Sequence, residues 1–212
     1  MLTTAFSQSL DIFAANSGSA IGLGLGLLSV TGVAEGLLQQ EDHAWDLYAS
    51  RLRQLLDLEG SEEFQVNTNT DDNQEHPVIA TLNDGRFVIA WQSSNQDGSG
   101  NGIFAQMYSL AGDPIGSEFQ VNTFVTDDQE GPAIAALADG GFVITWTGSG
   151  QDGVLYDVYA KRYSALGVAS GSEFRINTYT FSNQFQPAVA GQSHGGFIIA
   201  WSSMKQDGDS YG

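Results

Sequence analysis

The chain has 212 residues, no cysteine, and 25 acidic against 7 basic side chains, which gives a formal net charge of -18. This charge repels nucleic-acid phosphates and anionic membrane surfaces, and the lack of cysteine excludes disulfides and thiolate metal sites. Because 42% of the residues are hydrophobic and 11% aromatic, we expect a folded domain with a core and no nucleic-acid partner.

The first 45 residues differ from the rest of the chain. They contain no Lys or Arg, and their apolar stretch at 20–33 is too short and too glycine-rich for a clear membrane span. The first basic residue is Arg51, so the basic n-region of a signal peptide is missing and no export route is visible. We expect residues 1–45 to form an apolar plug, an oligomer contact or a poorly ordered leader, with a helix before Asp46.

From residue 46 onward the sequence repeats itself with a period of about 55 residues. The recurring motifs are GSEEFQVNT, GSEFQVNT and GSEFRINT, which end at Thr68, Thr123 and Thr178, and GRFVIAW, GGFVITW and GGFIIAW, which end at Trp91, Trp146 and Trp201. A QDG tripeptide follows each tryptophan at 96–98, 151–153 and 206–208. Such regular spacing is the signature of a repeat architecture.

The beginning and the end of the repeat region complement each other. Residues 46–68 align with 157–178 with one additional glutamate, and the chain reaches Gly212 just before the same element would recur. We therefore predict three circularly permuted repeats, formed by 46–68 plus 187–212, by 77–123 and by 132–178.

Each repeat predicts four short strands rich in β-branched and aromatic residues. The first strand lies at 77–82 and 132–137, and it ends in a turn where Gly85 and Gly140 supply a positive φ. The second strand is FVIAW, FVITW or FIIAW, the third IFAQMY or VYAKRY, and the fourth EFQVN or EFRIN. The second strand is apolar on both faces, which indicates a sheet covered on both sides.

These four-stranded units predict an all-β fold of β-propeller-like blades. A propeller usually has four to eight blades, so three repeats do not close a ring by themselves. Two chains could complete a six-bladed ring, the repeats could form a threefold β-prism or β-trefoil, or the chain could be part of a longer array. The first of these predicts a homo-oligomer.

Together, the motifs resemble a known repeat. GSEFQVNT at 116–123, PAIAALADGGFVITW at 132–146, QDG at 151–153 and VYAKRY at 158–163 are similar to a repeat of very large exported bacterial surface proteins. Those proteins often also carry hemolysin-type calcium-binding repeats. The resemblance covers 46–212 and implies an extracellular or cell-surface location, an adhesion or matrix role, and calcium. This chain lacks the glycine-rich nonapeptides that bind calcium in the larger members.

Acidic loop residues are the calcium candidates. Asp97, Asp152 and Asp207 recur in the QDG loops, and Asp72 and Asp127 lie in the loops after the fourth strands. Calcium needs six to eight oxygen ligands, which carboxylates and loop carbonyls can supply. The alternative is that each aspartate caps its own turn while the following glycine provides the positive φ.

Aromatic residues are the candidates for ligand contact. Phe124, Tyr179 and Tyr211 lie in loops, where an aromatic ring is accessible to a ligand. The tryptophans that end the second strands could stack on sugar rings, but tryptophans at one repeated strand position more often pack in the core.

No catalytic motif is visible, and we therefore expect a noncatalytic surface module for self-assembly, adhesion or matrix structure. The three histidines occupy different repeat positions, which does not match a metal site. Glu75 and Glu130 share one repeat position, but Phe185 takes it in the third copy. A lectin-like carbohydrate-binding propeller is the alternative. A glycan-cleaving hydrolase would need carboxylates that converge from different repeats.

Overall fold

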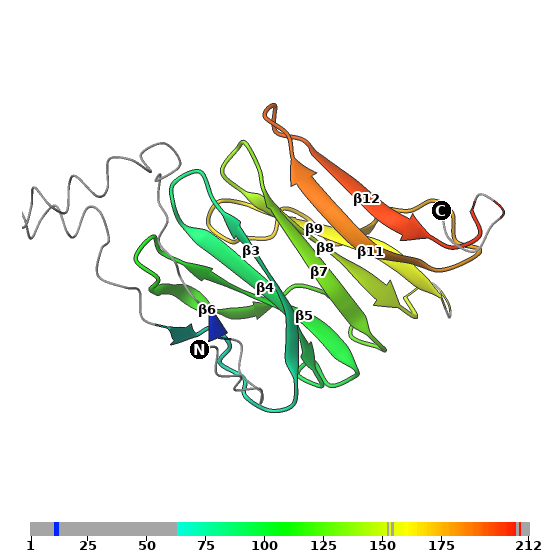
Figure 1. The fold of residues 1–212 in the computed structure, drawn as a ribbon, viewed down its shortest axis with the longest axis horizontal. Coiled ribbons are helices and arrows are strands. Elements are labelled where there is room, and N and C mark those ends of the chain that lie inside the picture. The colour runs from blue at the N-terminus through cyan, green and yellow to red at the C-terminus, as the bar shows by residue number, and fades with distance from the viewer. Residues whose placement is uncertain (1–10, 13–62, 152, 154, 207, 209–212) are drawn as a thin grey trace, which may run out of the picture. The chain divides into compact units, whose positions relative to one another are not determined.

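The computed structural model describes residues 11–12, 63–151, 153, 155–206 and 208 (Figure 1). Every regular element among them is a β-strand, which confirms the predicted all-β fold class. No helix in this part is long and apolar enough to cross a membrane. The predicted helix before Asp46 and the predicted strand at 47–52 lie outside the described residues.

The chain divides into two compact units, Asp11–Phe64 and the unit that contains Gln65–Gly212. A small two-stranded sheet consists of β1 (Asp11–Ile12) and β2 (Phe64–Gln65). The larger sheets described next all belong to the unit that contains Gln65–Gly212.

The first large sheet is an antiparallel meander in the order β3-β4-β5-β6. Its strands are β3 (Gln74–Thr81), β4 (Phe87–Ser94), β5 (Asn101–Tyr108) and β6 (Pro114–Gln120). The turn between β3 and β4 closes through the N–H of Gly85, which donates to the Leu82 carbonyl at 3.0 Å. Gly85 has a φ of 87°, the positive value that the sequence predicts for this turn.

The second sheet forms the same meander one repeat later, and the third begins it again. The second contains β7 (Gln129–Ala136), β8 (Phe142–Ser149), β9 (Tyr156–Tyr163) and β10 (Phe174–Arg175), paired in that sequence. The third contains β11 (Gln184–Gly191) and β12 (Phe197–Ser203). The four-stranded units are therefore the predicted propeller-like blades (Figure 1).

The first strand of each sheet begins three residues earlier than the sequence predicts. The pairing register shifts between Glu75 and Val78, and again at the same place in the next two repeats. His76, Gly131 and Gln186 lie at this shift, with φ values of 54°, 60° and 53°. Each first strand therefore crosses a β-bulge, which allows the strand to continue through the segment before the proline.

The sheets pack face to face in chain order. Phe142, Ile144 and Trp146 of β8 pack against Val88 and Ala90 of β4, in a core between the first and second sheets. The other face of β8 presents Val143, which joins a second cluster with Phe197 and Ile199 of β12. The second strand of the middle sheet is thus covered on both faces, as its sequence predicts.

Candidate functional site

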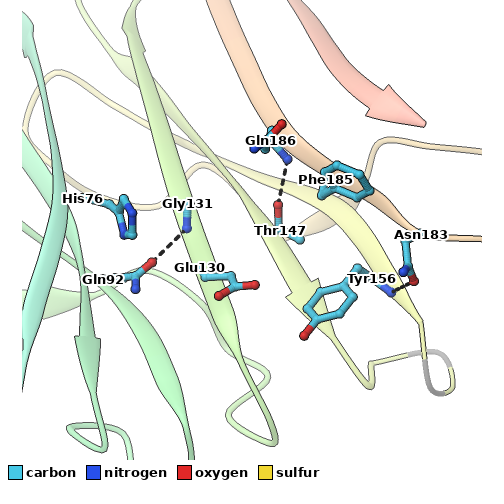
Figure 2. A pocket seen from close by; sticks show the side chains of 9 residues that line it. All are labelled: His76, Gln92, Glu130, Gly131, Thr147, Tyr156, Asn183, Phe185 and Gln186. Atoms are coloured by element: carbon cyan, nitrogen blue, oxygen red, sulfur yellow. Dashed lines mark hydrogen bonds between the residues drawn. The ribbon is translucent and has the colours of Figure 1, made fainter. Parts of the chain in front are cut away.

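A cleft of about 510 Å³ runs along the row of bulges and is lined by all three sheets (Figure 2). The first sheet contributes His76 and Gln92, and the third contributes Phe185 and Gln186. The first strands β3, β7 and β11 are neighbours in space, so residues from distant parts of the sequence meet here. A concave site of this size suits a small molecule or a few units of a polymer.

The second and third bulges each bind a side chain of the preceding sheet. The Gly131 N–H donates to Oε1 of Gln92 at 3.1 Å, and the Gln186 N–H donates to Oγ1 of Thr147 at 3.2 Å (Figure 2). Gln92 in β4 and Thr147 in β8 occupy the same position of successive repeats. The left-handed backbone at the bulge thus directs a backbone N–H toward a side chain of the neighbouring sheet. This repeated hydrogen bond connects the sheets that line the cleft.

Glu130 is the carboxyl group that lines the cleft, and its acidity is altered. Its side chain is half-buried on β7, directly before the bulge residue Gly131. Burial raises the pKa of Glu130 above its ordinary value of 4.5, the negative charge of Asp128 raises it further, and His76 acts in the opposite direction. A carboxyl group that keeps its proton to a higher pH is suited to donate it to a bound molecule.

Tyr156, on β9, faces the same region. Burial raises the pKa of the Tyr156 phenol, and the charges of Glu130 and Asp128 raise it further. Figure 2 shows the Glu130 carboxyl group extending from β7 toward the Tyr156 ring. Tyr156 is therefore a neutral hydroxyl donor beside the carboxyl group, and its ring provides an apolar surface.

The remaining lining combines amides with a second ring. The backbone N–H of Tyr156 donates to Oδ1 of Asn183 at 3.3 Å (Figure 2), and the ring of Phe185 also lines the cleft. Aromatic rings next to amide, hydroxyl and carboxyl groups fit a ligand with apolar faces and many hydroxyl groups. The net charge of -18 disfavours an anionic ligand, so a neutral one fits best.

In the structure, the Asp97 carboxylate accepts hydrogen bonds from its own loop and from the neighbouring strand segment. Its carboxylate accepts hydrogen bonds from the Ser99 N–H at 3.2 Å, from Gln120 at 3.3 Å and from Asn122 at 3.2 Å. These contacts match the capping alternative, in which the aspartate organises the loop. Asp152 and Asp207, the matching residues of the other two loops, lie outside the described residues.

The two remaining calcium candidates also lie in loops with local contacts. Asp72 accepts a hydrogen bond from the Asn95 amide at 3.2 Å, and the Asp127 N–H donates to Ser99 Oγ at 3.2 Å. Within the described ranges, no three or more His, Asp or Glu side chains are grouped to hold a metal ion. Calcium binding stays a prediction.

The aromatic candidates lie apart from the cleft. The backbone carbonyl of Phe124 accepts a hydrogen bond from Asn122, and the Tyr179 hydroxyl donates to the Lys205 carbonyl at 3.4 Å. Neither side chain lines the cleft, and Tyr211 lies outside the described residues. Trp91 and Trp146 are fully buried, so core packing explains these two tryptophans.

Sequence reasoning did not assemble this cleft. Glu75 and Glu130 recur at one repeat position, and this recurrence was a visible signal for a functional carboxyl group. The repeat position alone does not show which of the two glutamates is buried. The repeat positions of the three histidines gave His76 no role, yet the structure places it in β3 and in the lining of the cleft. Tyr156 lies at the end of the segment after QDG, which the sequence predicts to be a loop. No motif marks Tyr156 as a functional residue.

The fold is similar to that of several solved carbohydrate-cleaving enzymes. An endo-arabinase from Bacteroides thetaiotaomicron is 12% identical, with a TM-score of 0.47, over 68% of this chain and 55% of that one. An α-L-arabinofuranosidase from Lactobacillus brevis is 12% identical, with a TM-score of 0.46, over 70% and 58%. A thermostable family-43 glycoside hydrolase is 11% identical, with a TM-score of 0.44, over 70% and 55%. This chain thus spans little more than half the length of these proteins.

No protein-family model matches the sequence, and the comparison with curated proteins finds no match. The structural neighbours are glycoside hydrolases, which contradicts the interpretation of the chain as a noncatalytic adhesion or assembly module. That interpretation rested on the lack of a catalytic motif in the sequence. The physical reason for the error is that a site built from three sheets leaves no local motif.

Proposed function

We propose that this chain takes part in glycan hydrolysis, with a neutral polysaccharide bound in the cleft and Glu130 as the proton donor. The observation that carries the proposal is the half-buried Glu130 carboxyl group, with its raised pKa, in a cleft lined by rings and amides. A protonated carboxyl group beside the scissile bond is what glycoside hydrolysis requires of its acid. The predicted extracellular location is compatible with a polysaccharide substrate and stays a prediction.

The proposed reaction uses two carboxyl groups. Glu130 donates its proton to the glycosidic oxygen as the bond between this oxygen and the anomeric carbon breaks. A water molecule adds to the anomeric carbon and transfers a proton to the Asp128 carboxylate, which is not part of the cleft lining but whose charge acts on both Glu130 and Tyr156. The products are two shorter glycans with free hydroxyl groups, so one water molecule is consumed for each bond that is cleaved.

The other residues of the cleft position the sugar. Tyr156 and Phe185 offer ring faces on which the apolar face of a pyranose or furanose ring can stack. The amides of Gln92 and Asn183 provide hydrogen-bond partners for sugar hydroxyl groups. Gln92 is itself held by the Gly131 N–H, so its orientation is set before the ligand arrives.

The test is the release of reducing ends from a panel of neutral polysaccharides that includes arabinan. We expect the wild-type chain to release reducing ends from at least one polysaccharide, and Glu130→Gln to lower kcat by about 100-fold or more. Glu75→Gln is the matched control, because Glu75 holds the same strand position in the preceding repeat and is exposed. Equal activity of wild type and Glu130→Gln, or no release from any polysaccharide, would refute the proposal.

A further inference from the structure

The loop between β10 and β11 holds an aromatic ring in water. Phe181 is 86% exposed, the highest value among the large hydrophobic side chains in the described part of the chain. Transfer of such a ring from water to an apolar contact is favourable, so an exposed phenyl ring offers binding free energy to a ligand that covers it. Single exposed apolar residues are common on protein surfaces, and the surroundings of Phe181 therefore decide whether it belongs to a site.

A second ring lies against Phe181. The ring centroids of Tyr179 and Phe181 are 5.8 Å apart, and the angle between the two ring planes is 63°. The Tyr179 hydroxyl donates to the Lys205 carbonyl at 3.4 Å, which ties the tyrosine to the segment after β12. Phe181 stays exposed in spite of the contact between the rings. We call Tyr179 and Phe181 the ring pair.

Hydrogen bonds hold the loop of the ring pair at both ends. At its start, the buried side chain of Asn177 donates to the Tyr179 carbonyl at 2.9 Å and accepts from the Val158 N–H at 2.8 Å. At its end, Oδ1 of Asn183 accepts from the Tyr156 N–H at 3.3 Å. Binding to rings that already hold their position costs less conformational entropy than binding to a loop that must first be ordered.

The loop of the ring pair leads directly into the cleft. Asn183 and Phe185 follow Phe181 in the chain, and both line the cleft (Figure 2). Because consecutive Cα atoms are about 3.8 Å apart, the Cα of Phe181 lies within about 8 Å of the Cα of Asn183. The ring pair itself lies outside the cleft lining. A polymer that fills the cleft can therefore continue past Asn183 onto the ring pair.

The repeat does not require two rings in this loop. In the preceding loop, between β6 and β7, the two equivalent positions hold Phe124 and Thr126, and in the first repeat they hold Asn69 and Asp71. All three loops lead into a first strand with the same bulge. The second ring is therefore an addition to the loop that enters the third sheet. Core packing does not explain it, since Phe181 is exposed.

We propose that Tyr179 and Phe181 form an outer sugar-binding subsite, which stacks on a further unit of the polysaccharide that occupies the cleft. The identity of the ligand rests on the proposed function, whereas the arrangement of the ring pair does not. The apolar face of a neutral pyranose or furanose ring matches an exposed phenyl ring. The occupant is a continuation of the polymer in the cleft, because Phe181 lies two positions before a residue of the cleft lining.

Binding without cleavage tests the subsite. All proteins carry Glu130→Gln so that the polysaccharide is not consumed, and affinity electrophoresis in gels that contain arabinan or another neutral polysaccharide of the panel gives the dissociation constant. Phe181→Thr installs the residue type of the preceding repeat and should raise this constant about 3- to 10-fold, the loss expected for one stacking contact. Because Phe181 is exposed, the variant should keep the stability of its parent.

Leu166→Thr is the matched control. Leu166 is 77% exposed in the loop between β9 and β10, so this variant removes another apolar side chain from the surface and should leave the dissociation constant unchanged. The disaccharide of the same polysaccharide provides a second comparison, because the cleft alone accommodates it. Phe181→Thr should weaken the binding of the polymer more than the binding of the disaccharide.

The outcomes separate the subsite from the proposed catalysis. An unchanged affinity of Phe181→Thr for the polymer, an equal loss for polymer and disaccharide, or equal losses from Phe181→Thr and Leu166→Thr would overturn the subsite and leave the role of Glu130 untouched. A selective loss of polymer binding supports the subsite even if Glu130→Gln and the wild type release reducing ends equally, which refutes only the proton donor. Lack of binding to every polysaccharide of the panel overturns both.

Discussion

The indole N–H of Trp201 donates a 3.0 Å hydrogen bond to Oε1 of Gln184, which is fully buried. The same two residue types stand one repeat earlier as Trp146 and Gln129, which are also fully buried. At that place, neither the Trp146 indole N–H nor Gln129 Oε1 has a partner among the described residues. The third repeat thus satisfies a polar pair that the second repeat buries without a hydrogen bond.

Trp201→Phe should therefore lower the free energy of unfolding by about 1–3 kcal/mol through the lost hydrogen bond, in addition to the loss of ring volume. The acceptor Gln184 Oε1 would remain buried without a partner. Trp146→Phe is the matched control, because it loses ring volume but no hydrogen bond to Gln129. Urea unfolding of both variants and the wild type measures the difference. Because Trp146 is fully buried and Trp201 only partly buried, the deciding outcome is the effect of Trp201→Phe itself, and an unchanged free energy of unfolding contradicts the role of this hydrogen bond.

Glu130 should make stability depend on pH. The folded state raises the pKa of Glu130 above 4.5, so the folded chain holds this proton at a pH at which the unfolded chain has released it. The folded state binds more protons in that window, and stability falls as pH rises through it. Between pH 4 and pH 7, we expect the wild type to lose stability relative to Glu130→Gln. Parallel unfolding curves at both pH values measure this change, and a constant difference between the two proteins argues against the raised pKa.

Lys161 should produce the opposite dependence at alkaline pH. Its Nζ donates to the Val121 carbonyl at 2.8 Å, and burial lowers its pKa below 10.5 while the charge of Glu173 acts the other way. The unfolded chain therefore binds more protons just below pH 10.5, and stability rises with pH through that window. Lys161→Gln, which installs the residue found at Gln106 in the first repeat, should remove this rise. Thermal unfolding of the wild type and of Lys161→Gln from pH 8 to 10.5 measures this effect. The stability curves of the two proteins should diverge as pH rises, and parallel curves would contradict the lowered pKa of Lys161.

The bulge at Gly131 should tolerate asparagine better than valine. Gly131 has a φ of 60°, and a Cβ added there meets no atom within 4 Å, so the cost of a substitution is conformational. Gly131→Val should destabilise the chain by about 1–3 kcal/mol, because a β-branched residue is strained in the left-handed region. Gly131→Asn should cost less than about 1 kcal/mol, since asparagine adopts this region more readily.

Thermal melts of both Gly131 variants measure this difference. His76 and Gln186 provide the internal comparison, because they occupy the equivalent bulges with side chains and similar φ values. Equal destabilisation by asparagine and valine would show that the left-handed backbone at Gly131 does not determine the loss of stability on substitution.

The strands were predictable because their signals are local. Alternating β-branched and aromatic residues define β4 and β8, and the glycines at Gly85 and Gly140 end the preceding strands at the turns. The bulges were not predictable, since His76 and Gln186 are not glycine and a positive φ is uncommon for any other residue. Their conformation follows from contacts with the neighbouring sheet, such as the Gln186 N–H with Thr147.

The candidate site was less predictable than the fold. Glu75 and Glu130 are identical in type and repeat position, yet Glu75 is exposed while Glu130 is half-buried in the cleft. The difference in burial arises from the neighbouring sheets, which a single repeat does not contain, whereas Asp128, which raises the pKa further, lies only two residues before Glu130. The interpretation as a noncatalytic module failed for this reason.

The sequence by itself determined the period of the repeat, the all-β class and the four-stranded unit, because each depends on side-chain patterns within one stretch of chain. Only the tertiary structure decided in which repeats the equivalent faces are covered and where a cleft opens. Burial depends on what packs against a residue, so Val143 and Ile198 share a repeat position and differ from 0% to 58% in exposure. The acidity of Glu130 is likewise set first by burial, to which the neighbouring sheets contribute, and then by the charge of Asp128 close by in the sequence and of His76 from the first sheet.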